Sequence, residues 1–590
     1  MSDSLISEQV KQYYDNAYLP EHFTQEEERF LRPFFTNLDK PVFVIKNLPS
    51  EVKGAVASRY SRATASLRRL FLNEYLNPII YPDMQKGWEN LSADEQYESM
   101  QLREKFFAWL SFQEENGGVE EIVNIQRGRA FFEKWLAQYG DDSIAELGAE
   151  LVCLEGISLV ASKEIEDKRI GISPLEKSTR YVQFWEKKAN GQYQYCIPYE
   201  LQDEEKETYI QLMDKLFSTY NDLAQPYLDY IKQLYPKGED ETETSFNASR
   251  GARRFDDLRE LLPFGTQTNV ALLGNGRAFE DLITRLLATS LTELQWCGQC
   301  ILEELQQVTP SFVKRSLTPR GEITRQYRKR LFGGKVSLAT KYILPSQKVT
   351  RPTEWVMLID QTPDADALVI ASYLFSQSGD QSLASVLSQV KTFSPEKRAQ
   401  ILKEILSLRQ SENETPDRAR DRFHKVPRAF ENASYLFEFW ARGGEYRDLH
   451  RHRQATQERQ LFTTHWGYDV EQDLETSEFY ESVEKVFAKA EVVFEQLVKI
   501  DPFVAQYVVP FGYIQHWYMR LTAREIYWIV ELRTGPQGHP HYRMICQQLG
   551  HVAKAADPAL FQGLLIDEAS YSLARRESEK KIEKKLESFS

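Results

Sequence analysis

A chain of 590 residues is too long for one ordinary hydrophobic core, and 42% hydrophobic with 27% charged residues indicates a globular protein of several domains. Its formal net charge of −14 argues against nucleic-acid binding by the surface as a whole, and five cysteines are too few for a disulfide framework. No apolar run reaches the length of a membrane span, and the amino terminus lacks the apolar core of a signal peptide, so we expect a cytoplasmic protein.

A strand followed by a helix is predicted near the start of the chain and again beyond its midpoint. Residues 41–49 (PVFVIKNLP) have the apolar run and closing turn of a buried strand, and residues 51–72 follow with helical periodicity. Residues 355–363 (WVMLIDQTP) and 365–379 repeat this order. Such repetition indicates an internal duplication.

A second pair of segments supports the duplication. The sequence LLPFG at residues 261–265 recurs as VVPFG at residues 508–512. Each is followed at the same distance by an Arg, which is Arg277 in the first copy and Arg524 in the second. We therefore predict an α+β protein built from two tandem copies of one fold, each a small sheet with many helices.

The predicted copies cover residues 1–315 and 336–590, and residues 316–335 between them are predicted to be a basic linker. The run 314–335 holds eight Lys and Arg against one Glu. Basic clusters can bind nucleic acid. In an acidic chain we favour a solvated linker, or one that packs on acidic residues of the other copy.

The triplet Arg451, His452, Arg453 is the most informative motif. Arg is a planar fork of donors that grips phosphate and stays charged, and Arg447 lies one helical turn before the triplet. His can hydrogen-bond a ring nitrogen or carbonyl near neutral pH. The residue types suit a ligand that carries phosphate, although an isolated triplet of this kind is more often an exposed basic turn.

The surroundings of the triplet resemble the flavin-dependent thymidylate synthase family, whose pattern is roughly RHRxxSxNExSxRY. The triplet and Thr456 match the first part of the pattern, and Glu431 precedes them at a suitable distance. The second part fails, because Leu461 and Thr463 replace its Ser and Arg.

The first copy shows the complementary half of the pattern. Asp167, Lys168 and Arg169 stand where the family has its triplet. The second part of the pattern is intact as Glu176, Ser178, Arg180 and Tyr181.

The resemblance implies a reaction and the residues that serve it. The family converts dUMP to dTMP with FAD, methylenetetrahydrofolate and NADPH. The residues implied in binding FAD are Arg451, His452, Arg453, Thr456, Glu431, Ser143, Glu146, Asn275, Arg277 and Arg524. Those implied in binding the nucleotide are Glu176, Ser178, Arg180, Arg259 and Arg533.

Two of these residues are candidates for the chemistry itself. Arg533 is expected to stabilise negative charge that develops on the pyrimidine, or to bind the phosphate. Ser178 has the position of a nucleophile, but no general base is evident beside it, so we interpret it as a nucleotide ligand. The alternative is a Ser that caps a turn before Tyr181.

The way the motif is divided predicts one composite site. In the family, one subunit of a homotetramer supplies the triplet and the late Arg, and another supplies ExSxR and the Arg before Pro. Here the second copy keeps the first set and the first copy keeps the second. If two copies replace two subunits, the protein is a homodimer. One departure is Asp448, which replaces a Gln of the family and would repel a phosphate.

The rival prediction is a non-catalytic paralogue that keeps the fold, or flavin and nucleotide binding, as a scaffold or binding protein. Two other motifs are weaker. GNGRAF at 274–279 lacks the third Gly of a dinucleotide-binding turn. WCGQC at 296–300 lies in a helical run, where two buried cysteines are expected rather than a redox pair, and no zinc signature is present.

Overall fold

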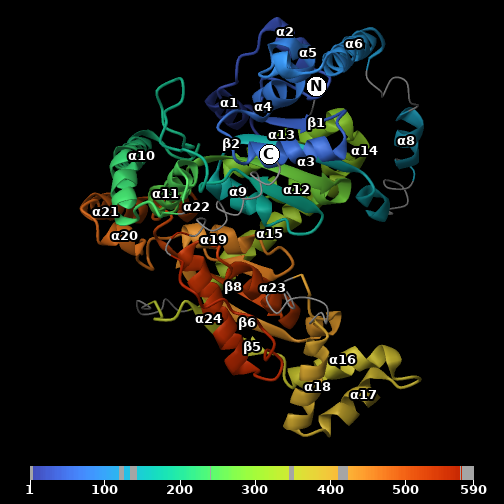
Figure 1. The fold of residues 1–590 in the computed structure, drawn as a ribbon, viewed down its shortest axis with the longest axis vertical. Helices are drawn as coiled ribbons and strands as arrows, with labels where there is room; N and C mark the ends of the chain where they lie inside the picture. The colour runs from blue at the N-terminus through green and yellow to red at the C-terminus, as the bar shows by residue number, and fades with distance from the viewer. Residues whose placement is uncertain are drawn as a thin grey trace. The chain divides into compact units, whose positions relative to one another are not determined.

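The computed structural model describes residues 4–117, 125–132, 134, 142–239, 241–343, 351–409, 423–571 and 573. The chain forms two compact units, and Figure 1 shows the fold of both. Unit 1 consists of residues 1–211 and 264–346, and unit 2 consists of residues 212–263 and 347–590. The division differs from the predicted one, because residues 212–263 of the first copy belong to unit 2.

Unit 1 is built on a four-stranded antiparallel sheet in the order β1-β2-β4-β3. The four residues of β1, VFVI, are all buried, as the apolar run of the sequence predicted. The strands are β1 (Val42–Ile45), β2 (Ala149–Ser158), β3 (Ile172–Glu176) and β4 (Gln267–Asn275). The described helices are α1 (Glu8–Ala17), α2 (Gln25–Leu31), α3 (Ser50–Tyr60), α4 (Leu67–Phe71), α5 (Asn77–Ile80), α6 (Ala93–Asn116), α8 (Ile125–Phe132), α9 (Leu159–Glu166), α12 (Gly276–Leu286), α13 (Thr292–Val308), α14 (Pro310–Val313) and α15 (Pro319–Tyr342).

Unit 2 repeats the sheet in the order β5-β6-β8-β7, again antiparallel throughout. The strands are β5 (Val356–Gln361), β6 (Ser434–Arg442), β7 (Thr456–Arg459) and β8 (Ile514–Thr522). The described helices are α11 (Glu243–Leu258), α16 (Ala365–Leu374), α17 (Leu383–Lys391), α18 (Pro395–Ser407), α19 (Gly443–His450), α20 (Gln472–Glu475), α21 (Tyr480–Leu497), α22 (Pro502–Ala505), α23 (Ala523–Arg533) and α24 (Pro540–Ala556). The equal strand order confirms the predicted α+β fold in two repeated halves.

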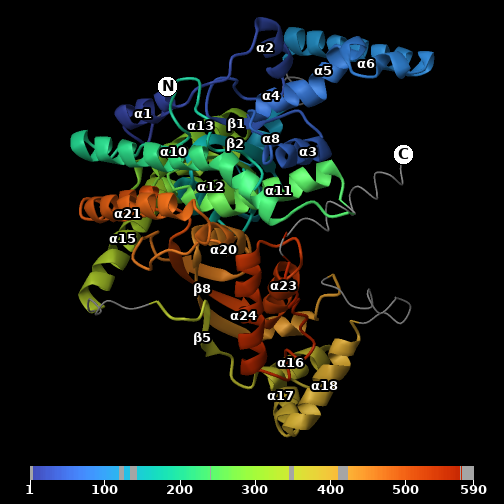
Figure 2. The ribbon, with the colours of Figure 1, turned by 60° about the vertical axis from the view of Figure 1, so that its left-hand side comes forward.

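Helix α10 (Asp203–Leu234) begins in unit 1 and continues into unit 2. Its second part lies beside α21, where the rings of Tyr227 and Phe479 meet edge to face at 5.9 Å between centroids (Figure 2). The end of segment 212–263 also pairs with the second Pro-Phe-Gly segment in unit 2. Pro263 pairs with Pro510, and the Phe511 N–H donates to the Leu262 carbonyl at 3.0 Å. The segment 212–263 is therefore held in unit 2 by backbone pairing as well as by ring contacts.

The segment predicted to be a basic linker is not an irregular connection. Residues 319–342 form helix α15, and Gly333 and Gly334 lie within it. Arg315 forms two hydrogen bonds to the Glu280 carboxylate at 2.8 and 2.6 Å, and Arg328 pairs with Asp281 on the same helix, α12. Part of the basic charge is thus neutralised inside unit 1. This weakens the argument that the segment binds nucleic acid.

The two cysteines of WCGQC lie inside α13, where both are buried. Burial raises the pKa of Cys297 and of Cys300 well above the usual range, so the structural interpretation of this motif holds. Within the described residues, no helix combines the length and the apolarity that crossing a membrane requires.

Candidate flavin and nucleotide site

A cavity of about 830 Å³ opens in unit 2 between the end of α19, strands β6 to β8 and helix α23. Its wall contains six of the ten residues that the resemblance implied in binding FAD. These are Glu431, Arg451, His452, Arg453, Thr456 and Arg524. They come from three separate stretches of the chain, so their convergence is a result of folding and not of sequence spacing.

The triplet is positioned by the end of a helix. Helix α19 ends at His450, and Arg451 is its C-cap with helical backbone angles of φ −63° and ψ −13°. The chain then turns and enters β7 at Thr456, which pairs with Arg520 of β8. The triplet therefore lies in a short turn between a buried helix and an edge strand, with its side chains toward the cavity.

His452 is held in one protonation state. The Nε of Arg533 donates a hydrogen bond to His452 Nε2 at 3.0 Å. Burial, together with the charges of Arg533 and Arg451, lowers the pKa of His452 to about 3. The ring is therefore neutral at physiological pH, with Nε2 as acceptor and the proton on Nδ1, which remains a donor for a ligand. Sequence reasoning placed Arg533 on the nucleotide and missed that it positions His452.

Arg524 is fixed by two acceptors. Its Nη1 donates to Glu431 at 2.5 Å and its Nε donates to the Val426 carbonyl at 3.1 Å. The hydrogen bond from Arg524 keeps the pKa of Glu431 below its usual value. In unit 1, Arg277 of α12 donates to Glu146 of η5 (Asp142–Glu146) at 2.7 Å, so the same pair recurs at corresponding places of the two copies. The sequence predicted that all four residues belong to the site, but it did not predict that each Arg bonds to its Glu.

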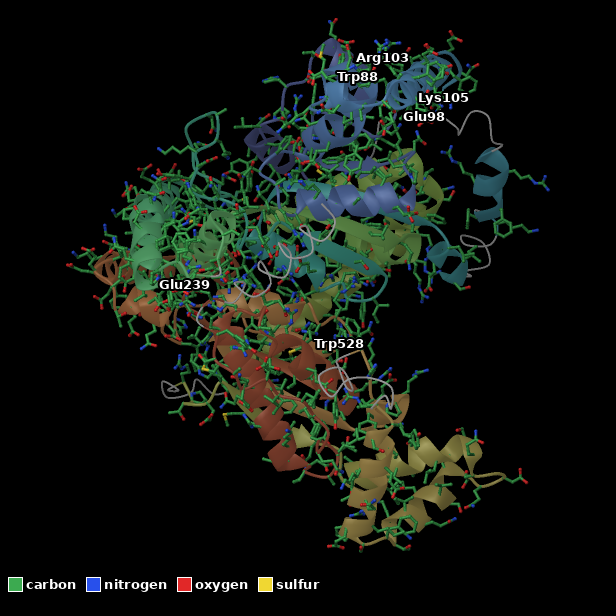
Figure 3. The ribbon with its side chains drawn as sticks, viewed as in Figure 1. Trp88, Glu98, Arg103, Lys105, Glu239 and Trp528 are labelled. Atoms are coloured by element: carbon green, nitrogen blue, oxygen red, sulfur yellow. The ribbon has the colours of Figure 1, made fainter. Side chains whose placement is uncertain are left out.

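The cavity wall is basic and partly aromatic. Seven Arg and Lys side chains line it against three Glu, and the balance favours an anionic ligand. Trp528, on α23, lines the same wall, and the Lys425 ammonium lies 4.7 Å from its ring centroid (Figure 3). The volume falls in the range of 300–1,000 Å³ that ligand pockets typically have. The residues present therefore fit a dinucleotide such as FAD.

Arg259 and Arg533 meet at Asp448 inside unit 2. Arg259 is buried, and its guanidinium lies 2.9 Å from a Glu445 oxygen and 3.5 Å from an Asp448 oxygen. Arg533 donates to the Asp448 backbone carbonyl at 2.8 Å. Arg259, which precedes Pro263 in the first predicted copy, therefore lies beside helix α19, which leads to the triplet of the second copy. Its ion-pair partners, which also include Glu260 at 3.8 Å, are carboxylates of the protein itself.

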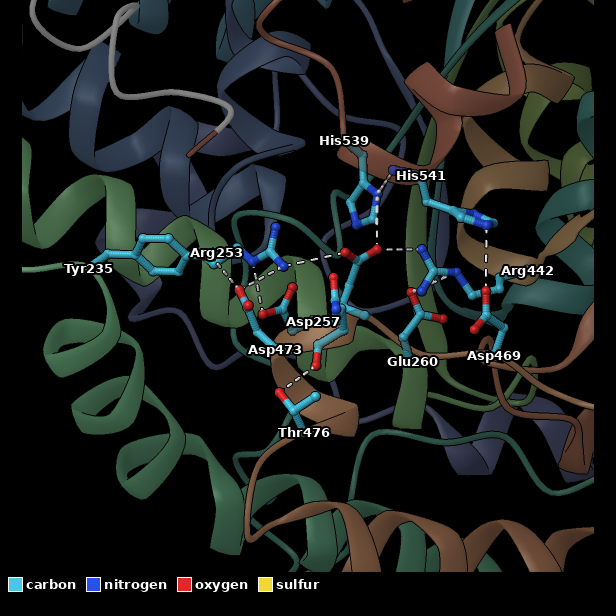
Figure 4. Close-up of polar contacts among 12 residues, drawn as sticks. Tyr235, Arg253, Asp257, Glu260, Arg442, Asp469, Asp473, Thr476, His539 and His541 are labelled. Atoms are coloured by element: carbon cyan, nitrogen blue, oxygen red, sulfur yellow. Dashed lines mark hydrogen bonds and ion pairs between the residues drawn. The ribbon is translucent and has the colours of Figure 1, made fainter. Parts of the chain in front are cut away.

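A buried network of charges surrounds Arg442, which Figure 4 shows together with Glu260 and His539. Arg442 contacts Glu445 at 3.1 Å and Glu471 at 2.5 Å. Burial opposes ionisation of Glu445, but the Arg442 guanidinium holds the pKa of that carboxyl well below its usual range. Burial raises the pKa of Glu260, beside them, well above its usual range. The network joins α19, α20 and η6 (Arg259–Leu261) around charges that compensate each other.

Three residues of this network, Glu260, Glu445 and His539, lie close enough together to hold a metal ion. No metal site was predicted, because the three residues are far apart in the chain and match no ligand spacing. Glu445 already pairs with two guanidiniums, and burial lowers the pKa of His539 to about 4. We therefore interpret the group as part of the ion-pair network.

The residues of the first copy that were assigned to the nucleotide lie at the end of β3 in unit 1. Glu176 is buried, and it accepts hydrogen bonds from Ser162 at 2.5 Å and Lys163 at 3.1 Å. The Ser178 hydroxyl accepts from the Arg180 N–H at 3.2 Å, which is the turn-capping interaction that sequence reasoning left as an alternative. These contacts orient the segment without deciding whether it binds a nucleotide.

The other predicted residues of unit 1 have local roles. Asn275 is the N-cap of α12 and accepts from the Ala278 N–H at 2.8 Å. Ser143 is exposed in the short helix η5 (Asp142–Glu146). Lys168 of the altered triplet pairs with Asp281 at 2.7 Å, so its charge is neutralised within the unit. The composite site draws residues from both units and stays a prediction.

Comparison with known proteins decides the family. The model of the family described as "Thymidylate synthase complementing protein" matches residues 96–311 and 357–559, one region in each half of the chain. The chain belongs to this family. A UPF0159 protein of Chlamydia pneumoniae is 35% identical over 532 residues, which cover 90% of this chain and 92% of that protein. A UPF0159 protein of Thermoplasma acidophilum is 29% identical over 484 residues, which cover 77% and 92%. The tandem family assignment from sequence is confirmed, and both relatives match over nearly their whole length.

Proposed function

We propose that the unit 2 cavity binds FAD and that the protein catalyses the reductive methylation of dUMP to dTMP with methylenetetrahydrofolate and NADPH. The observation that carries the proposal is the convergence of six motif residues on one basic cavity of about 830 Å³. FAD, when bound, supplies the redox chemistry, and the protein supplies position and charge. Membership of the thymidylate synthase complementing family supports a nucleotide as substrate.

Each part of the cavity wall has a role in this proposal. Arg451 and Arg453 hold the phosphates of the dinucleotide as charged hydrogen-bond donors. Neutral His452 offers its Nδ1–H to an acceptor of the cofactor, and Arg533 keeps the ring in that tautomer. Trp528 provides an apolar face for a flat ring.

The nucleotide is proposed to bind at a site composed of both units. Arg180, Glu176 and Ser178 from unit 1 contact it as ligands, and Arg533 stabilises negative charge on the pyrimidine. Ser178 is a ligand in this scheme and not a nucleophile. Two chains are proposed to form a homodimer that reproduces the four-unit assembly of the family.

A second candidate is a non-catalytic paralogue that binds flavin but not the nucleotide phosphate. The observation that favours it is the pair of carboxylates, Glu445 and Asp448, that already contacts Arg259. A fixed anion beside a guanidinium competes with a phosphate for the same donors and repels it.

The absorption spectrum of the purified protein, recorded with and without added FAD and dUMP, separates the two candidates. Bound flavin whose spectrum changes on addition of dUMP supports the enzyme. Bound flavin whose spectrum ignores dUMP at all concentrations supports the non-catalytic paralogue. Protein that neither contains FAD nor takes it up contradicts both.

A further inference from the structure

A second cavity, of about 770 Å³, lies entirely in unit 1. It is lined by α1, the loop 188–197, strands β2 and β4, and α13. Figure 1 labels α1, β2 and α13. Lys177 lines it, one residue beyond the end of β3. Since side chains alternate along a strand and Glu176 faces α9, Lys177 points to the opposite face of the sheet.

The Lys177 ammonium is buried without a hydrogen-bond acceptor. The residue is 6% exposed, and among the described residues no acceptor lies within hydrogen-bonding distance of its Nζ. The ring of Phe184 lies 5.4 Å from its Nζ. Burial, which outweighs the attraction of Glu155, lowers the pKa of Lys177 to about 8. Because Lys177 lines the cavity, its ammonium is open to a ligand that supplies the acceptor the protein does not.

Another buried lysine of the same unit shows what a structural role looks like. Lys163 is 0% exposed and contacts two carboxylates, Glu166 and Glu176. Lys177 has no such pair. The difference lies in what each side chain faces, since Lys163 faces packed protein and Lys177 faces a cavity.

The carboxylates of the cavity wall are already engaged by protein donors. Glu155 accepts from the hydroxyls of Tyr18 at 2.8 Å and Tyr60 at 3.1 Å. Glu293 accepts from the N–H and the hydroxyl of Ser158, both at 2.7 Å. The third carboxylate of the wall, Glu21, pairs with Arg69 at 2.9 Å and accepts from the Ser66 hydroxyl. The two ammonium groups are therefore the charged groups of the wall with the fewest protein partners. Lys188, whose pKa burial also lowers, adds a second ammonium, bound only to Gln267 at 3.3 Å among the described residues.

The backbone beside Lys177 is shaped to leave this space. The pairing of β2 with β4 shifts between Leu154 and Ile157, and Gly156 has a φ of +73°, which favours glycine. The corresponding strands β6 and β8 of unit 2 pair without a shift. The bulge is thus a feature of unit 1 and not of the repeated fold. Aromatic rings of Tyr13, Tyr14, Tyr195 and Trp296 complete the wall.

We propose that this cavity is a binding site for a small organic anion, a carboxylate or phosphate on a flat apolar body, with Lys177 as its main anion ligand. The aromatic wall contacts the flat body, and Lys188 assists with the anion. Lys177 lies between Glu176 and Ser178 in the chain, but none of the residues assigned to FAD or to the nucleotide lines this cavity, so anion binding here is tested separately from that function.

Covalent labelling of the full-length protein with pyridoxal 5′-phosphate tests the site. The lysine nitrogen attacks the aldehyde carbon and water leaves, which forms an imine. Borohydride then adds hydride to that carbon, the nitrogen gains a proton, and a stable secondary amine remains. We expect peptide mass spectrometry to find Lys177 labelled at least tenfold faster than Lys168, which pairs with Asp281. Equal or slower labelling of Lys177 would overturn the proposal.

Protection of the unmodified protein identifies the anion. Inorganic phosphate alone, or benzoate alone, should slow the labelling of Lys177 in a saturable way. Protection by phosphate assigns a phosphate ligand and protection by benzoate a carboxylate ligand. Failure of both to protect contradicts the proposal, and this measurement needs no variant.

The variant Lys177→Met distinguishes a ligand-binding role of Lys177 from a structural role. It removes an unpaired buried charge and keeps an apolar stem of similar length, so we expect unchanged or raised thermal stability with loss of benzoate and phosphate binding by tenfold or more. Lys163→Met is the matched control, because it strands two buried carboxylates and should lower the melting temperature. A Lys177→Met protein that is less stable than the parent would show a structural lysine and overturn the assignment.

Discussion

Arg533 Nε lies 3.0 Å from His452 Nε2, so the late Arg of the motif holds the imidazole of the triplet in its neutral form. The residues are far apart in sequence and both were predicted to serve the ligand. From their contact we infer that Arg533 acts partly by positioning His452. A substitution of Arg533 should therefore disturb flavin binding as well as any chemistry on the nucleotide.

His452 should make folding stability depend on acid. Its pKa is about 3 in the folded protein against 6.5 for an ordinary His, so the unfolded chain binds more protons between these values. Stability from the neutral ring is complete above about pH 6.5 and is lost as the pH falls toward 3. We expect Tm to fall less between pH 7 and pH 4.5 for His452→Gln than for the parent. Parallel melting curves for both proteins would contradict the neutral assignment.

Arg453→Ala should weaken FAD binding. Loss of one charged hydrogen bond costs about 1.5–3 kcal/mol, which corresponds to roughly a ten- to hundredfold rise in Kd. Lys168→Ala, at the altered triplet of unit 1, is the matched control and should leave Kd nearly unchanged, because Lys168 pairs with Asp281. Fluorescence titration with FAD measures both. Equal losses from the two variants would refute the assignment of the flavin to unit 2.

Asp448→Gln should raise the affinity for dUMP. The substitution removes a carboxylate 3.5 Å from Arg259 and restores the residue type of the family. A unit charge at about 4 Å is worth roughly 1–4 kcal/mol in partly solvated surroundings, so we expect about a tenfold gain or more by calorimetry. An unchanged dUMP affinity would mean that Asp448 does not oppose the phosphate.

Arg442→Met should destabilise unit 2 strongly. Arg442 is buried and contacts Glu445 and Glu471, and breaking a buried pair on one side typically costs about 3–5 kcal/mol. Lys485→Met removes an exposed pair with Glu481 and should change little. Chemical denaturation followed by tryptophan fluorescence compares the two. Similar stability in both variants would contradict a structural role for the network.

The sequence predicted the repeated fold because duplication leaves local traces. The paired Pro-Phe-Gly segments and the two Arg that follow them identified equivalent strands and helices, and both sheets have the same strand order. The triplet identified the cavity because the family motif is local to one helix end and one strand.

What the sequence did not reveal depends on packing between distant segments. The repeat shows which residues are equivalent but not which unit they pack in, and residues 212–263, which belong to the first predicted copy, lie in compact unit 2. The Arg259–Asp448 pair was missed because Asp448 was judged only against a phosphate. Helix α15 was missed because eight basic residues and two Gly resemble a solvated linker until α12 supplies their carboxylates.

Calorimetric titration of the full-length protein with FAD, followed by dUMP, tests the central claim most directly. Because one triplet is intact and the other is replaced by Asp167, Lys168 and Arg169, we predict one FAD and one dUMP per chain. Arg453→Ala and Arg180→Ala should each impair that same site, with a combined effect that is less than additive. A stoichiometry of two FAD per chain, or no FAD binding at all, would contradict the account.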